Sequence, residues 1–201
     1  FKFLMAGLNT NFGITCPTDC SVPTTPALPE QDCPCPPKLS EICGLYFQGT
    51  EQPTDWTTAA GWTGVVDNAD TSGAKTKYLV GRGSIAEPED TVLEGPKKRD
   101  YVTDRVRTLT FEVYVCDDQT YEFLRTLECG TILPCFYYET LGKCLFGDQV
   151  DNTDLTGIGI QAESIKVSFV YEQGRESVEK AIITLTWSSL ISPRRITNPL
   201  A

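Results

Sequence analysis

Cysteine is the residue type whose spacing in this chain comes nearest to a metal-binding pattern. Nine cysteines are present and histidine is absent. The first group is Cys16, Cys20, Cys33, Cys35 and Cys43. Structural zinc takes four thiolate or imidazole ligands in a tetrahedron, commonly from two Cys-x2-Cys arms. Because the spacings here are Cys-x3-Cys and Cys-x-Cys, disulfide bridges or buried thiols fit better than zinc, and we assign no metal and no cofactor.

The second group of cysteines, Cys116, Cys129, Cys135 and Cys144, is spread along the middle of the chain. Buried cysteine behaves as a small hydrophobic residue, so packing is the default role of these four. An odd total leaves one thiol over if all the others form bridges. A secreted β module stapled by disulfides and a reduced cytosolic protein therefore both remain open.

Catalytic and cofactor-binding patterns are weak. Gly81–Ala86 matches the G-x-G-x-x-A pattern of dinucleotide-binding folds, but that motif needs a helix directly behind it, and Pro88 opposes one. Without histidine, acid–base catalysis would depend on carboxylates, Lys or Tyr, and the carboxylates lie mainly in predicted turns. The sequence identifies no catalytic residue, and we expect a protein that is not an enzyme.

The charge balance is acidic, with a formal net charge of −10. Such a chain lacks the basic footprint of a sequence-independent duplex-DNA binder, although DNA could slide past its surface without adhering. Asp148, Asp151 and Asp154 lack the D-x-D-x-D-G spacing of a calcium loop and are interpreted as an acidic, solvated surface. The short basic run Lys97, Lys98, Arg99 is flanked by acids and indicates a charge contact between subunits.

Ser164–Leu190 is the clearest structural element, a long β-hairpin. Apolar and polar side chains alternate along its arms, as the strand period of two requires, and Gly174 supplies the turn between them. The second arm is apolar on both faces, since Ile182 and Ile183 point to opposite sides. A strand of this kind needs cover on both faces, so we expect Ile182 and Ile183 at or near a subunit contact.

The rest of the pattern is mainly β. Strands are predicted at 44–50, 76–83, 101–116, 132–140 and 143–148, with a bulge between Val106 and Leu109. An acidic turn then leads through residues 157–163 to the hairpin. Residues 118–127 predict one short helix, with Asp117 or Asp118 as its N-cap. We therefore expect a β-sandwich or small β-barrel over residues 44–201, flanked by one short α-helix and carrying a long charged loop at 84–100.

Residues 1–43 predict a different kind of region, an irregular Pro/Cys-rich N-terminal arm. Eight of the thirteen prolines lie between Pro17 and Pro53, and helices or central strands do not accept that density. The opening residues FKFLMAGL are interpreted as an extended arm rather than a signal peptide. No apolar run approaches the ~20 residues that cross a bilayer, so we expect no membrane-spanning segment.

The order of elements from Tyr101 to Pro199 resembles the tail-tube and related ring-forming proteins of tailed bacteriophages. The resemblance lies in the strand VRTLTFEVYV, the capped helix DQTYEFLRTL, the aromatic strands FYYET and LFGD, and the hairpin SFVYEQGRESVEKAIITLTW. It implies a structural virion protein that forms rings, commonly sixfold, which stack into a tail tube. Its partners would be copies of itself and other virion tail proteins, and its place the virion tail, assembled in the cytoplasm of the bacterial host.

The same resemblance implies a physical rather than a chemical mechanism. An acidic lumen lets double-stranded DNA pass during genome ejection without specific binding, and Asp148, Asp151 and Asp154 are the candidate lumen residues. The loop at 84–100 would reach the next subunit or ring. Residues 16–43 are not part of the usual pattern, so another phage neck, ring or decoration protein is an alternative.

Overall fold

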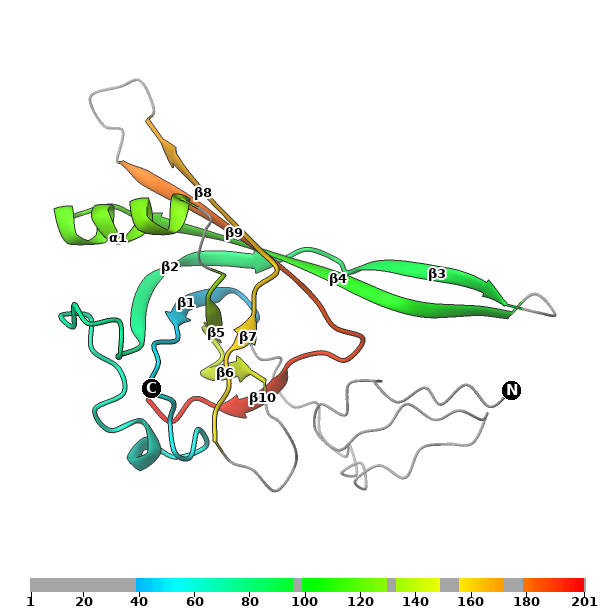
Figure 1. The fold of residues 1–201 in the computed structure, drawn as a ribbon, viewed down its shortest axis with the longest axis horizontal. Helices are drawn as coiled ribbons and strands as arrows, with labels where there is room; N and C mark the ends of the chain where they lie inside the picture. Colours follow the sequence, from blue (N-terminus) through cyan, green and yellow to red (C-terminus); the bar gives the residue numbers. More distant parts are fainter. Residues whose placement is uncertain (1–38, 96–98, 130–132, 149–155, 172–178, 201) are drawn as a thin grey trace.

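The computed structural model describes residues 39–95, 99–129, 133–148, 156–171 and 179–200, and they form a mainly β fold with one α-helix (Figure 1). Ten strands make one antiparallel sheet. Their bounds are β1 Ile42–Phe47, β2 Lys77–Ile85, β3 Glu89–Gly95, β4 Arg99–Tyr114, β5 Cys135–Thr140, β6 Cys144–Gly147, β7 Ile160–Gln161, β8 Ser164–Val170, β9 Lys180–Ser188 and β10 Arg194–Thr197. The order is β10-β6-β5-β1-β2-β4-β9-β8, with β3 beside β4 and β7 beside β5.

The sheet closes on itself as a small barrel. Strand β7 pairs with β5, with Ile160 opposite Phe136. After the two intervening residues 162 and 163, β8 begins to pair with β9, with Ser164 opposite Thr186. One continuous segment therefore joins the two sides of the sheet, and the path β5-β1-β2-β4-β9 returns to its start through it. Of the two architectures expected from the sequence, the small barrel describes this closure.

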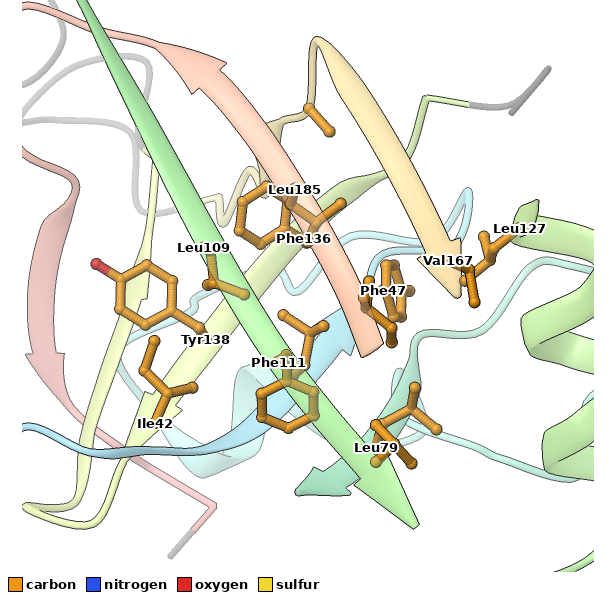
Figure 2. Packing of buried hydrophobic residues seen from close by; sticks show 14 of the residues in the cluster. Ile42, Phe47, Leu79, Leu109, Phe111, Leu127, Phe136, Tyr138, Val167 and Leu185 are labelled. Carbon is orange, nitrogen blue, oxygen red and sulfur yellow. The ribbon is translucent and has the colours of Figure 1, made fainter. Parts of the chain in front are cut away.

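The barrel interior holds the larger hydrophobic core. It takes inward side chains of β1, β2, β4, β5, β8 and β9 together with Leu127 of the α-helix, and the labelled residues of Figure 2 belong to it. Phe111 lies fully buried against Gly81 and Gly83 of β2, where an added Cβ would come within 2.8 Å and 2.7 Å of the Phe111 ring. The GRG sequence is thus a strand that leaves room for an aromatic ring, and no helix follows it, in contrast to a dinucleotide-binding motif.

A second, smaller core covers the outer face of β1 and β5. Trp56 and Trp62 come from the long connection between β1 and β2, which includes the short 3-10 helix η2 (Ala59–Trp62), and they pack with Tyr46, Tyr137 and Leu145. Strands β1 and β5 are therefore buried on both faces and lie at the centre of the domain. The tryptophans in an otherwise polar, turn-rich segment are the sequence signal of this cover.

Helix α1 (Asp118–Glu128), the one α-helix of the described residues, packs against the barrel. Its N-cap is Asp117, whose carboxylate accepts a 2.7 Å hydrogen bond from the Thr120 backbone N–H, as predicted. Leu124 and Leu127 are buried in the barrel core, and Phe123 meets Phe47 edge to face. Within the described ranges, no helix has the length and apolar character needed to traverse a lipid bilayer.

Residues 84–100, expected as a long charged loop, are largely strand. β3 pairs with β4 from Glu89 opposite Val106 to Gly95 opposite Arg99. The prediction was wrong because charged side chains in a solvent-exposed ribbon produce the same composition as a loop. In Figure 1 the ribbon, defined here as β3 with residues 99–106 of β4, extends away from the other strands.

One strand boundary and one predicted bulge also differ from expectation. β1 begins at Ile42, so Cys43, assigned to the N-terminal arm, belongs to the barrel. The register of β4 against β9 is unbroken from Val106 to Tyr114, so there is no bulge between Val106 and Leu109. The irregularity lies instead between Thr91 and Val92 of β3. The bulge was predicted wrongly because Arg107, and not Val106, occupies the inward position next to Leu109.

Candidate functional site

The outer part of the ribbon carries four exposed apolar side chains. Val92 lies opposite Val102 and Leu93 opposite Tyr101, and their exposed fractions are 52%, 40%, 62% and 52%. Successive residues of a strand point to opposite faces, so each face of the ribbon presents one apolar cross-strand pair. Four of the exposed large apolar side chains of the described residues thus lie on the ribbon, two on each face.

An ion pair ties the two strands together nearer the barrel. The Arg105 guanidinium donates to both carboxylate oxygens of Asp90, at 2.5 Å from Nε and 2.8 Å from Nη2. Hydrogen bonding from Arg105 holds the pKa of the Asp90 carboxyl below its usual value. The bidentate ion pair joins directly opposite residues of β3 and β4, and so supports the pairing of the two strands at the base of the ribbon.

A groove opens on the inner face of the sheet at the end of the barrel opposite helix α1. Its volume is about 500 Å³, and its walls include Ile42, Ile85, Tyr138, Phe146 and Arg195. Figure 2 shows Ile42 and Tyr138 at one end of the core cluster and Val167 and Leu127 at the other. Helix α1 thus covers one end of the core, and the groove lies at the other.

A buried polar cluster lies behind the second core. The Glu139 carboxylate accepts hydrogen bonds from the hydroxyls of Tyr46 at 3.1 Å and Tyr78 at 3.4 Å, and the two rings stack with centroids 4.4 Å apart. Burial, with the nearby Glu139 charge, raises the pKa of Tyr78 to about 12 and that of Tyr46 further. The phenols therefore stay protonated and donate hydrogen bonds to the buried Glu139 carboxylate. The cluster fulfils the hydrogen-bonding needs of this carboxylate and does not provide a tyrosinate base.

Arg107 is a buried cation on the inner face of β4. Only 8% of the residue is exposed, one guanidinium nitrogen donates to Ser192 Oγ at 3.2 Å, and Nε is buried without a hydrogen-bond partner among the described residues. Burial lowers the pKa of Arg107. Its position near Tyr138 places it at the same end of the barrel as the groove.

The predicted cysteine cluster is only partly within the described chain. Cys16, Cys20, Cys33 and Cys35 lie outside the described residues. Cys43 is half-buried in β1, where its thiol lies 3.8 Å from the Glu139 carbonyl oxygen and burial raises its pKa. The described part of the chain holds no group of three or more His, Cys, Asp or Glu side chains able to bind a metal ion.

Of the predicted assembly and lumen residues, too, only some lie within the described chain. Lys97, Lys98, Asp151 and Asp154 lie outside the described residues, and Gly174 does too. Arg99 begins β4 opposite Gly95, and Asp148 is half-buried and bridged to Ile158.

The hairpin itself is confirmed, since β8 and β9 pair over Ser164–Val170 and Lys180–Ser188. Ile183 is fully buried in its own barrel, and the expectation that it lies at or near a subunit contact stays a prediction. Ile182 is half-buried on the outer face of β9, away from helix α1, and stays a candidate.

Sequence reasoning missed the apolar pairs of the ribbon. The signal was present as two short apolar runs, Thr91–Leu93 and Tyr101–Val102, on either side of a Gly-Pro turn sequence. Because acidic residues surround both runs, the whole stretch was interpreted as a charged loop. Comparisons with protein-family models, with curated proteins and with solved structures give no match. The ribbon, the groove and the charge of the chain are therefore the features that bear on its function.

Proposed function

We propose that this protein is a structural subunit that assembles with copies of itself into rings, and that the rings form part of the tail tube of a bacteriophage. The observation that supports self-assembly is the ribbon. A two-stranded ribbon has no interior, and here both of its faces carry an exposed apolar pair, Val92 with Val102 and Leu93 with Tyr101.

Such a ribbon is unstable on its own, and this is the energetic reason to expect neighbouring molecules to cover it. An isolated two-stranded hairpin is at best marginally stable in water, and exposed apolar clusters mark contact surfaces. Covering both faces would remove the four side chains from water at about 25 cal/mol per Å². A ribbon of this kind gains stability when neighbouring molecules contact both faces, as happens for a subunit held inside an assembly.

The negative charge of the chain supports the proposal that the ring encloses a channel for DNA. With a net charge of −10, a ring of subunits multiplies the negative charge around its opening. A wall of the same sign as the phosphate backbone keeps DNA from adhering, because adhesion depends on cations that displace counterions. We propose Asp148, Asp151 and Asp154 as part of that wall, the virion tail as the location, and other tail proteins as further partners.

Negative-stain electron microscopy of the purified chain tests the proposal. We expect rings, or stacks of rings, at high protein concentration. Leu93→Lys should reduce their number, because it places a charge in the apolar surface of the ribbon. Val80→Lys is the matched control, since Val80 is an apolar residue of similar exposure (67%) on β2. A chain that stays strictly monomeric at high concentration would contradict the proposed function.

A further inference from the structure

Three cross-strand pairs make up one face of the ribbon, named here the Leu93 face. Its apolar centre is Leu93 with Tyr101, whose exposed fractions are 62% and 52%. Alternate residues of a strand share a face, and β3 gains no extra residue at its irregularity, because residue 103 of β4 is the one without an opposite partner. From the barrel to the tip the pairs are Thr91 with Asp104, Leu93 with Tyr101, and Gly95 with Arg99.

The charged positions of the Leu93 face are separated by sign. Asp104 lies at the base, is half-buried and accepts a 2.8 Å hydrogen bond from the Arg105 backbone N–H, and no described cation forms an ion pair with it. Glu89, on the same face and nearer the barrel, is a second acid and is exposed. Arg99 is the charged position at the other end, and it closes the basic run 97–99 of the sequence.

The other charges of β3 and of the outer part of β4 belong to the opposite face of the ribbon. Asp90 and Arg105 lie opposite one another there and neutralise each other in the bidentate ion pair. Glu94 and Asp100 form a cross-strand pair between two pairs of the Leu93 face, so alternation places both positions on the opposite face too. The Leu93 face therefore runs from an acidic base through an apolar centre to a basic tip.

A face with this order of charge is complementary to itself when its direction is reversed. Two ribbons can pack with their Leu93 faces together, antiparallel, about a two-fold axis that passes through Leu93 and Tyr101. Thr91 with Asp104 and Gly95 with Arg99 lie two residues on either side of that axis, roughly 7 Å at about 3.3 Å per residue. Strand β4 of one copy then lies over β4 of the other, so that Arg99 of each copy meets Asp104 of its partner.

The position of the axis along the ribbon permits this overlap. Leu93 lies four residues from Glu89 at the start of β3, roughly 13 Å, and two residues from Gly95 at its end. In the paired arrangement Gly95 of one copy lies over Thr91 of the other and does not reach the start of the partner's β3. The ribbon extends away from the other strands, so each barrel lies beyond the overlap (Figure 1).

We propose that the Leu93 face of one copy pairs with the Leu93 face of a second copy, antiparallel and about a two-fold axis. The inference rests on the proposed self-assembly and names the partner of this surface. A two-fold contact uses the same surface on both copies, whereas a closed ring is built from contacts between two different surfaces. The ribbons therefore join one ring to another, and other surfaces close each ring.

The contact is small, and its strength depends on how many copies are already held together. One face of a two-stranded ribbon buries less than the about 1,200 Å² of total surface at which specific stable interfaces begin. Free copies should therefore pair only at high protein concentration. Several ribbons presented by one ring act together, which raises the overall affinity without any new contact.

Charge reversal tests the pairing. Arg99→Glu alone, and Asp104→Lys alone, place like charges at both crossing points and should weaken self-association about tenfold or more in sedimentation velocity. The double variant should restore it, and so should an equal mixture of the two single variants, because an acid again meets a base at each crossing point. The matched control reverses the exposed Glu122–Arg125 pair of helix α1 in the same combinations and should leave association unchanged.

Circular dichroism and thermal unfolding verify that each variant folds. Asp104→Asn keeps an acceptor for the Arg105 N–H and should weaken association less than Asp104→Lys. If the double variant and the mixture both stay as weak as the single variants while the unmodified chain assembles, the pairing is overturned and the proposed function stands.

Photo-crosslinking locates the contact without a change of charge. A benzophenone side chain at position 101 should crosslink to β3 or β4 of another copy. Crosslinks to any other surface, including residues 1–38 or the groove, would overturn the inference, as would no crosslink under conditions where the chain self-associates. Ribbon-paired copies without rings would support the inference and contradict the proposed function, and a chain that never self-associates would overturn both.

Discussion

Phe136 of β5 and Trp187 of β9 meet edge to face with ring centroids 5.5 Å apart, although β1, β2 and β4 lie between their strands in the sheet. The contact exists because the sheet curls until its two sides face one another, and the β7–β8 segment then joins them. Both side chains are buried, at 0% and 2% exposure. This pair therefore reports on closure of the barrel, which positions the groove and the base of the ribbon.

Replacing Phe136 by Ala should cost about 3–5 kcal/mol of unfolding free energy, since it removes a large buried ring and leaves a cavity. Phe136→Leu should cost less than about 1.5 kcal/mol if the core repacks. Tyr171→Ala, at an exposed position, is the control and should change stability by less than about 0.5 kcal/mol. Urea unfolding measures all three, and equal effects for Phe136→Ala and Tyr171→Ala would refute barrel closure.

Ile182 and Ile183 should respond differently to the same substitution. Ile183→Lys buries an unpaired charge in the barrel core and should prevent folding. Ile182→Lys places the charge on the outer face of β9 and should leave the monomer folded while reducing assembly. Circular dichroism and sedimentation separate the outcomes. Normal assembly of Ile182→Lys would remove β9 from the list of subunit contacts.

Arg107→Met should leave the stability of the monomer unchanged or raise it by about 1 kcal/mol. The guanidinium is buried, burial lowers its pKa, and no carboxylate pairs with it among the described residues. A flexible apolar side chain of similar length avoids the cost of removing this charge from water. Arg105→Met, which breaks the exposed ion pair with Asp90, is the comparison. A loss of several kcal/mol in Arg107→Met would show that the charge has a stabilising partner.

Stability should fall as the pH rises above about 10. Burial raises the pKa of Tyr46, Tyr78, Tyr137 and Tyr138 in the folded chain, to about 12 for Tyr78. The unfolded phenols ionise near pH ~10. Above that pH the unfolded state has lost protons that the folded state retains, so the free energy of unfolding decreases as the pH rises from the unfolded pKa to the folded pKa.

Urea unfolding at several values between about pH 9 and about pH 11 measures this slope. Absorbance near the tyrosinate band should show the four phenols ionising together with unfolding. Tyr138→Phe removes one of these groups and should make the slope shallower. A flat stability profile across the range would mean that these tyrosines ionise freely in the folded protein.

The helix and the closing hairpin could be predicted from the sequence. The β8–β9 hairpin follows from alternation of Ile165, Val167 and Phe169 with polar neighbours, and helix α1 from Asp117 ahead of an apolar stripe that includes Leu124 and Leu127. These signals depend on spacing within about a dozen residues, because side-chain direction repeats every 2 residues in a strand and every 3.6 in a helix. The mainly β fold class with one flanking helix follows from these local predictions taken together along the chain.

The functional surfaces required the tertiary structure. Which of Ile182 and Ile183 is available to a neighbour depends on which face of β9 the closed barrel covers. Whether residues 84–100 are loop or ribbon depends on pairing of β3 with a 16-residue partner strand that continues into the barrel. The groove is made by residues as far apart in the chain as Ile42, Ile85 and Arg195. Local periodicity in the sequence determined the helix and most of the barrel strands. Pairing between distant strands decided which side chains are buried, that β3 and β4 project as a ribbon, and where the groove lies.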